Sequence, residues 1–166
     1  MGQQQPRQDE SPVQSFRLVE VQPGGAAGNA ENQAGADRAP IDTRARRCLI
    51  VDDNELFLAV AQDHLARGGL KIVGTATSQA QALRQAKALR PDVVLVDIGL
   101  GRESGFEVAR RLVESVPDLG SSVVLTSTRA EDDVVDLIAA SPAVGFISKD
   151  LLSARAIEGL LNANGF

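Results

Sequence analysis

The sequence predicts an α/β domain in which helices cover both faces of a parallel β-sheet. Five short apolar runs rich in β-branched residues recur between positions 48 and 147, and segments with helical periodicity separate them. Several runs are hydrophobic throughout, which is typical of strands that are buried on both faces. Because strand and helix alternate, right-handed crossovers place the strands parallel in one sheet.

The expected strands are short and begin at regular intervals. They lie at residues 48–51, 70–74, 93–96, 123–125 and 144–147. Each is followed by a segment whose pattern indicates a helix. The sequence therefore predicts five successive units, each a strand followed by a helix.

Three kinds of pattern predict the helices: an apolar face, capping-box spacings at the start, and glycines after the end. The segment 54–67 places four apolar residues on one face and ends at Gly68-Gly69; the four are Phe57, Val60, Ala61 and Leu65. Three pairs have capping-box spacing, namely Ser78 with Gln81, Ser104 with Glu107, and Thr128 with Glu131. A last helix is expected from about Ser153 to Asn162.

Composition divides the chain near residue 43. Residues 1–43 are rich in Gln, Gly, Ala, Pro and Asn, and they bury too little apolar surface to offset their ordering entropy. The alternating run at 16–21 is the exception, but one isolated strand is unstable. We predict a disordered N-terminal tail at 1–43 and a folded domain at 44–166.

Charge and aromatic content argue against direct nucleic-acid binding. The net charge is −5, and the chain has five Phe but no Trp or Tyr. It therefore lacks both a basic surface for phosphate groups and a supply of aromatic side chains on which nucleic-acid bases could stack. The small cluster of Arg44, Arg46 and Arg47 is interpreted as a solvated flank. The single cysteine, Cys48, begins an apolar run and is expected to be buried.

The sequence also indicates a cytoplasmic protein without membrane attachment. One cysteine cannot form an intrachain disulfide, which fits a reducing compartment. No apolar stretch is long enough to cross a bilayer, and the N-terminus lacks the hydrophobic segment of a signal peptide.

Polar side chains follow four of the predicted strands at the point where each strand ends. They are Asp52 and Asp53 after the first strand, Asp97 after the third, Thr126 and Ser127 after the fourth, and Lys149 after the fifth. Singly, each has an ordinary explanation as a helix cap, a turn residue or a solvated lysine. Together they place three carboxylates, hydroxyls and an ammonium at the carboxyl edge of the sheet, where open α/β folds bind ligands.

This set of groups suits phosphoryl transfer to a carboxylate. Clustered carboxylates repel one another and require a cation, and Mg2+ is a hard ion that prefers oxygen ligands. Asp97, the central acid, can then act as a nucleophile and form an acyl phosphate. Lys149 and the cation neutralise the phosphoryl oxygens, while Thr126 can donate a hydrogen bond to one of them.

Four segments resemble the signature segments of bacterial response-regulator receiver domains, the CheY-like family. They are LIVDDN at 49–54, VVLVD at 93–97, VVLTS at 123–127 and GFISKD at 145–150. The resemblance covers about residues 46–163 and is greatest to receivers of NarL/LuxR-type regulators. It implies a flavodoxin-like, doubly wound sheet of five parallel strands in the order 2-1-3-4-5, flanked by five helices.

The resemblance implies a role for each matching acid and for the lysine. Asp97 matches the phosphoacceptor, and Lys149 matches the lysine that pairs with the phosphoryl group. Mg2+ or Mn2+ would be held by Asp53, by Asp97, by Asp52 through water, and by the backbone carbonyl of Gly99.

Four further positions match residues that switch the domain or tune it. Thr126 matches the hydroxyl that moves toward the phosphoryl group, and Phe146 matches the aromatic residue that turns inward in the active state. Gly99 and Thr128 match positions that face the incoming water and tune dephosphorylation.

The chain departs from the family pattern at three positions. Gly101 stands where a proline is usual and is expected to loosen the loop. Ser127 is slightly larger than the usual Ala or Gly, and Asp150 replaces the commoner proline after Lys149. None of these changes removes a group from the site, so we expect a competent site with an altered phosphoryl lifetime.

The implied function is that of a phosphoprotein in two-component signal transduction. A sensor histidine kinase or a histidine phosphotransfer protein would supply the phosphoryl group, and a downstream protein, or a second copy in a homodimer, would respond. The chain would catalyse only its own phosphorylation and dephosphorylation. Because residue 166 directly follows the last expected helix, we expect a single-domain response regulator.

The sequence is also compatible with three alternative functions. The first is a pseudo-receiver that is never phosphorylated, and the second is the receiver fragment of a DNA-binding transcriptional regulator. The third, a phosphohydrolase of external substrates, is disfavoured because such enzymes usually carry a second Asp where this chain has Gly99. His64, the single histidine, is interpreted as a surface residue.

Overall fold

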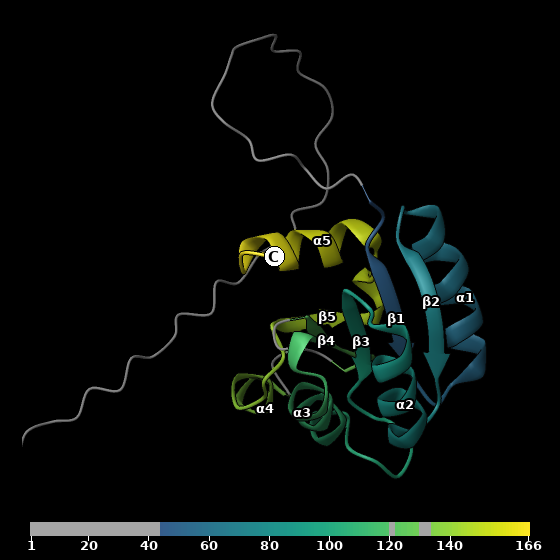
Figure 1. The fold of residues 1–166 in the computed structure, drawn as a ribbon. Helices are drawn as coiled ribbons and strands as arrows, with labels where there is room; N and C mark the ends of the chain where they lie inside the picture. The colour runs from purple at the N-terminus through teal and green to yellow at the C-terminus, as the bar shows by residue number, and fades with distance from the viewer. Residues whose placement is uncertain (1–43, 120–121, 130–133) are drawn as a thin grey trace, which may run out of the picture.

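The computed structural model describes residues 44–119, 122–129 and 134–166, and a five-stranded parallel sheet forms its centre (Figure 1). The strands are β1 (Arg47–Val51), β2 (Lys71–Ala76), β3 (Val93–Asp97), β4 (Val123–Ser127) and β5 (Gly145–Ser148). Their order is β2-β1-β3-β4-β5 and each pairing is parallel, so the predicted flavodoxin-like sheet is confirmed. The predicted tail and its run at 16–21 lie outside the described residues.

Helices cover both faces of this sheet. They are α1 (Glu55–Arg67), α2 (Gln79–Leu89), α3 (Gly105–Ser115), α4 (Val135–Ala139) and α5 (Ala154–Ala163), with short 3-10 turns at Pro117–Leu119 and Lys149–Leu151. Figure 1 shows α1 and α5 on one face and α2, α3 and α4 on the other. Within the described part of the chain, no helix combines the length and apolarity needed to span a membrane.

The sheet separates two apolar cores because successive side chains of a strand point to opposite faces. On β1, for example, Leu49 and Val51 pack toward α2 and α3, whereas Cys48 and Ile50 pack toward α1 and α5. Strands β3 and β4 are buried at every position, as their apolar sequences predict. Burial raises the pKa of the Cys48 thiol to about 12, so this cysteine is an inert core residue.

The buried face of α1 differs from the prediction at one position. Ala61 and Leu65 are buried as expected, but Val60 is 62% exposed and Leu58 takes its place in the core. The helix carries apolar residues on more than one face, so periodicity alone could not choose between them. His64 lies on the exposed side of the helix, as predicted.

Two predicted capping boxes have different outcomes. The Ser78 hydroxyl caps α2 by accepting a hydrogen bond from the N–H of Gln81 at 3.4 Å. The prediction for Ser104 was wrong, because its side chain makes no capping hydrogen bond although it stands at the N-cap of α3. Glu107, which the capping-box spacing pairs with Ser104, instead forms an ion pair with Arg110 at 2.7 Å, one turn along the helix.

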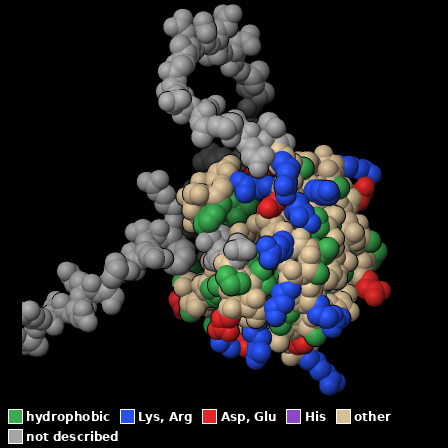
Figure 2. All heavy atoms as spheres, viewed as in Figure 1, with side chains coloured by type: hydrophobic (Ala, Val, Ile, Leu, Met, Phe, Trp, Pro, Cys, Tyr) green, Lys and Arg blue, Asp and Glu red, His purple; other side chains and the backbone are tan. Residues whose placement is uncertain are grey.

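Positive side chains are unevenly distributed over the surface. Figure 2 shows mostly Lys and Arg among the charged residues on the viewed face, although the net charge of the chain is −5. Helix α2 contributes Arg84 and Lys87 to the surface and contains no acidic residue. On α3, by contrast, Arg110 lies between Glu107 and Glu114 and pairs with both.

Candidate functional site

Three carboxylates meet at the carboxyl end of the sheet. Asp52 and Asp53 directly follow β1, and Asp97 is the last residue of β3. Strands β1 and β3 are parallel neighbours with Val51 beside Val96, so the residues that follow them emerge at the same edge. One oxygen from each of the three carboxylates lies within 4.8 Å of the others. The cluster predicted from strand ends is therefore present.

Lys149 reaches the same cluster from the end of β5. Its Nζ lies 2.6 Å from Oδ2 of Asp52 and 3.2 Å from Oδ1 of Asp97. The three side chains are 13%, 1% and 9% exposed, so these are largely desolvated ion pairs. Burial acts to lower the pKa of the lysine, but the contact with Asp52 and the charges of Asp97 and Asp52 outweigh it and raise the pKa. The ammonium therefore stays charged.

Asp97 has the opposite electrostatic balance. Burial raises the pKa of its carboxyl group, Lys149 lowers it, and the negative charges of Asp52 and Asp53 raise it further, with a net rise. One ammonium faces three carboxylates, and the set carries an excess of negative charge. A divalent cation would balance that excess.

The donor set fits a hard cation such as Mg2+ or Mn2+. Oδ1 of Asp52 accepts a hydrogen bond from the N–H of Asn54 at 2.9 Å. Oδ2 is buried and makes no aligned hydrogen bond within the described residues, although the ammonium of Lys149 lies 2.6 Å away. A buried carboxylate oxygen with this unused capacity, beside two further carboxylates, provides the ligands that Mg2+ prefers.

The loop after β3 borders the acidic cluster through two glycines. A Cβ on Gly99 would lie 3.6 Å from Oδ2 of Asp97, so its backbone lies beside that carboxylate. The carbonyl of Gly99 accepts a hydrogen bond from the N–H of Gly101 at 2.9 Å. Gly101 has a φ of +58°, which proline cannot adopt, and a Cβ there would approach Oδ2 of Asp53 to 3.2 Å. The loosening expected at Gly101 stays a prediction, but the local backbone depends on glycine.

Thr126 lies next to Asp97 across the sheet. The two residues are in register on β4 and β3, and the carbonyl of Thr126 accepts a hydrogen bond from the N–H of Ile98 at 2.9 Å. Thr126 is 2% exposed. Phe146 on β5 is half-buried and packs against the core on the α3 side of the sheet.

Three further residues border the site, namely Ser127, Thr128 and Asp150. Ser127 is buried, and its hydroxyl accepts a hydrogen bond from the backbone two residues ahead. Thr128 is exposed, while Glu131, its expected capping partner, lies outside the described residues. Asp150, the residue after the site lysine, is exposed and accepts a hydrogen bond from the hydroxyl of Ser148.

Phe57 is a site residue for which the sequence pattern predicts only a place on the apolar face of a helix. Its ring centroid lies 4.3 Å from Nζ of Lys149. The sequence does place Phe57 in the first turn after Asp52 and Asp53, which is a signal of proximity to the carboxylates. Its contact with Lys149, however, depends on where β5 lies in the sheet.

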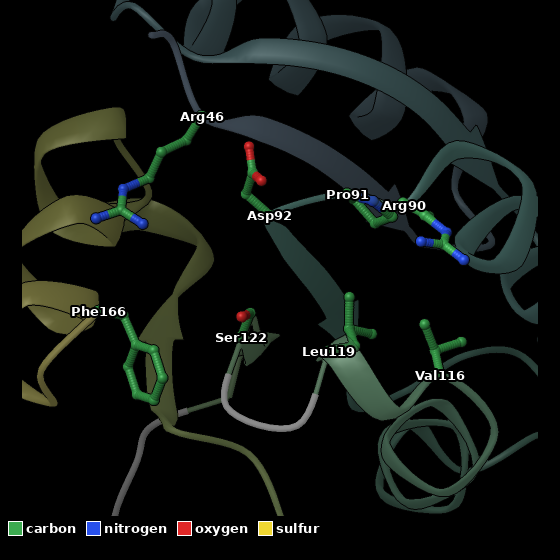
Figure 3. A pocket seen from close by; sticks show the side chains of 8 residues that line it. All are labelled: Arg46, Arg90, Pro91, Asp92, Val116, Leu119, Ser122 and Phe166. Atoms are coloured by element: carbon green, nitrogen blue, oxygen red, sulfur yellow. The ribbon is translucent and has the colours of Figure 1, made fainter. Parts of the chain in front are cut away.

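A separate hollow of about 360 Å³ lies at the opposite, amino-terminal end of the sheet (Figure 3). Its lining includes Arg46 and Asp92, which precede β1 and β3, and Phe166 at the end of the chain. The carboxylate of Asp92 accepts a hydrogen bond from the N–H of Arg47 at 2.7 Å and so holds the start of β1. This hollow is remote from the carboxylate cluster, and its carboxylate has a structural partner.

The raised pKa of Asp97 predicts a pH-dependent stability in the absence of divalent cations. The folded state binds this proton more tightly than the unfolded chain, whose pKa is near 3.8. The contribution of Asp97 is therefore fully present below that value and is lost as the pH rises through the folded-state pKa. Denaturant unfolding in EDTA from about pH 4 to 8 should show the unfolding free energy of the wild type falling relative to that of Asp97→Asn. Parallel pH profiles for the two proteins would contradict the prediction.

Comparisons with known proteins agree with this geometry. The model of the response regulator receiver domain matches residues 48–160. The chain is 35% identical over 116 residues to the DNA-binding transcriptional activator DevR/DosR of Mycobacterium tuberculosis, covering 68% of this chain and 52% of that protein. It is 26% identical over 115 residues to the chemotaxis protein CheY of Thermotoga maritima, covering 69% of this chain and 94% of that protein.

A solved structure shows the same fold. The signal receiver domain of the response regulator NarL from Mycobacterium tuberculosis has a TM-score of 0.60 and 32% identity, covering 74% of this chain and 99% of that one. The chain spans about half the length of DevR/DosR and of other curated relatives that it matches. With a family model that covers most of its folded region, the chain belongs to the response regulator receiver domain family.

Proposed function

We propose that this chain is a signalling switch that accepts a phosphoryl group on Asp97 from a histidine kinase or a histidine phosphotransfer protein. One observation carries the proposal: Asp97 shares a buried cluster with two other carboxylates and lies 3.2 Å from the ammonium of Lys149. A nucleophilic acid beside a fixed cation and a set of metal-type oxygens is the arrangement that phosphoryl transfer requires.

The transfer itself needs little beyond positioning and charge. A carboxylate oxygen of Asp97 attacks the phosphorus of the donor, a P–O bond forms, and the P–N bond to the donor imidazole breaks with its electron pair leaving on nitrogen. Lys149 neutralises the charge that gathers on the phosphoryl oxygens. Asp52, Asp53, Asp97 and the carbonyl of Gly99 would hold Mg2+ or Mn2+, which when bound adds positive charge at the phosphoryl oxygens.

The response would run through β4 and β5. The hydroxyl of Thr126, one strand away from Asp97, would donate a hydrogen bond to the new phosphoryl group. Phe146 lies beside Leu125 on the neighbouring strand, so a shift of β4 reaches its ring directly. Gly99 and Thr128 are exposed at the rim and would tune the access of water during dephosphorylation.

A small phosphodonor tests the proposal without the natural kinase. Incubation with acetyl phosphate and Mg2+ should add the mass of one phosphoryl group, as read by intact-protein mass spectrometry, and Asp97→Ala should gain none. Asp63→Ala is a matched control, because Asp63 is 62% exposed on α1 and pairs with Arg67 instead of Lys149. A wild-type protein that gains no mass would instead favour a pseudo-receiver.

The output of the whole protein is a further part of the proposal. We infer a cytoplasmic regulator that acts through protein contacts, including contacts with a second copy of itself. The second candidate is the receiver portion of a DNA-binding regulator, and it is favoured by the relatives that are twice as long. A native protein that migrates at a mass well above 17.5 kDa in extracts of its own cells would support the second candidate, and one that migrates at that mass would contradict it.

A further inference from the structure

We propose that Phe57 is a positioning residue whose ring holds the ammonium of Lys149 in place between Asp52 and Asp97. This inference rests on the proposed function, because the ammonium matters chemically only if Asp97 is phosphorylated. The ring of Phe57 contacts the ammonium of Lys149, which is not the group that is phosphorylated, so its role is to place another group.

The contacts of the ammonium carry the proposal. Lys149 has three N–H donors on Nζ, and two carboxylates lie at 2.6 and 3.2 Å from that atom. The ring centroid of Phe57 lies at 4.3 Å, inside the ~6 Å range over which an aromatic face attracts a cation. The lysine side chain is only 13% exposed, so the ring and the carboxylates together replace most of its water.

The ring is fixed by the same turn that orients Asp52. The N–H of Asn54 donates to Oδ1 of Asp52 at 2.9 Å, and Oδ1 of Asn54 accepts a hydrogen bond from the N–H of Phe57 at 3.0 Å. The ring also packs against the core between the sheet and α1. The start of α1 therefore positions two partners of Lys149, which are the carboxylate of Asp52 and the ring of Phe57.

This arrangement restricts the conformational freedom of the Lys149 side chain at the rim of the site. Lysine ends in a strongly hydrated ammonium on a four-carbon stem, and its rotamer freedom must be lost before transfer. A ring held by a helix start limits the positions that Nζ can adopt and keeps it within reach of Asp97. Groups placed in advance need no reorganisation when charge develops on the phosphoryl oxygens.

The test compares variants that keep or remove the aromatic face. In saturating Mg2+, Phe57→Leu should lower the rate constant of phosphorylation by acetyl phosphate by about 5- to 10-fold, because an apolar side chain remains but the cation–π contact is lost. Phe57→Tyr or Phe57→Trp should restore the rate to within about 2-fold of the wild type. Leu56→Ala is the matched control, since Leu56 is 76% exposed on the same helical turn, and its rate should not change.

Three outcomes would overturn the inference: a wild-type rate in Phe57→Leu, a failure of both aromatic variants to restore the rate, or an equal loss in Leu56→Ala. Proton NMR supplies a readout that does not depend on phosphorylation. The ε-methylene of Lys149 should show an upfield ring-current shift that is lost in Phe57→Leu, and an unshifted signal in the wild type would contradict the placement. If the wild type shows the shift but is never phosphorylated, the proposed function fails while the placement of Lys149 stands.

Discussion

Replacing Gly105 with alanine should destabilise the fold by about 3 kcal/mol and displace Asp97. A Cβ on Gly105 would lie 2.7 Å from the Cα of Ile98 and 2.8 Å from the carbonyl carbon of Asp97. Both are backbone atoms, so no side-chain rotation relieves the overlap. The N–H of Gly105 also donates to the carbonyl of Ile98 at 3.0 Å, which holds the start of α3 directly against the end of β3.

Gly159 offers a control for this substitution within the same chain. It lies inside α5, and apart from the adjacent backbone of its own helix a Cβ there would meet no heavy atom of the described chain within 4 Å. Gly159→Ala should therefore stabilise the protein by about 0.5 to 1 kcal/mol through helix propensity alone. Urea unfolding measures both effects, and phosphorylation by acetyl phosphate reports the displacement of Asp97. Equal stability of Gly105→Ala and the wild type would refute the close approach.

Replacing Lys149 with methionine should have a comparably large effect. Without divalent cations it should lower the unfolding free energy by about 3 kcal/mol, because two largely buried carboxylates lose their counter-charge. The phosphorylation rate should fall by about 100-fold or more, since the cation beside the acceptor is lost while most of the side-chain length is kept. The relevant carboxylates are Asp52, at 1% exposure, and Asp97, at 9%.

The size of this effect depends on burial and should therefore be specific to the site. Lys87→Met is the control, because Lys87 is exposed on α2, and its stability should change by no more than about 0.5 kcal/mol. Adding Mg2+ should recover part of the stability of Lys149→Met by supplying another positive charge to the same carboxylates. A loss of equal size in both variants, or no response to Mg2+, would contradict the buried ion pairs.

The carboxylates of the site were predictable from local sequence because strand ends are local features. Runs that are apolar at every position must be buried on both faces, and the first polar residue after each run must lie at an end of the sheet. In a parallel sheet all carboxyl ends share one edge, so the sequence predicts that Asp52, Asp97 and Lys149 lie at that edge. Nothing local, however, sets the distance between atoms on different strands.

Local patterns were insufficient wherever several partners compete for one group. The spacing of Ser104 and Glu107 matches a capping box, yet arginines one turn along the helix take the carboxylate. Val60 matches an apolar stripe, yet Leu58 fills the core because α1 carries apolar residues on adjacent faces. In each case the sequence allows two arrangements. Ion pairs on the exposed surface of α3 select one for Glu107, and packing against the sheet selects one for α1.

Three features are predictable from the sequence alone: the order of strands and helices along the chain, the apolar layers, and the sheet edge that carries the acids. These features follow from side-chain periodicity, which the covalent chain fixes residue by residue. Two contacts are visible only in the folded protein: the ring of Phe57 against the ammonium of Lys149, and Gly105 against the backbone of Asp97. Such contacts join segments far apart in the chain, and their distances depend on strand register and on the docking of α1 and α3 against the sheet.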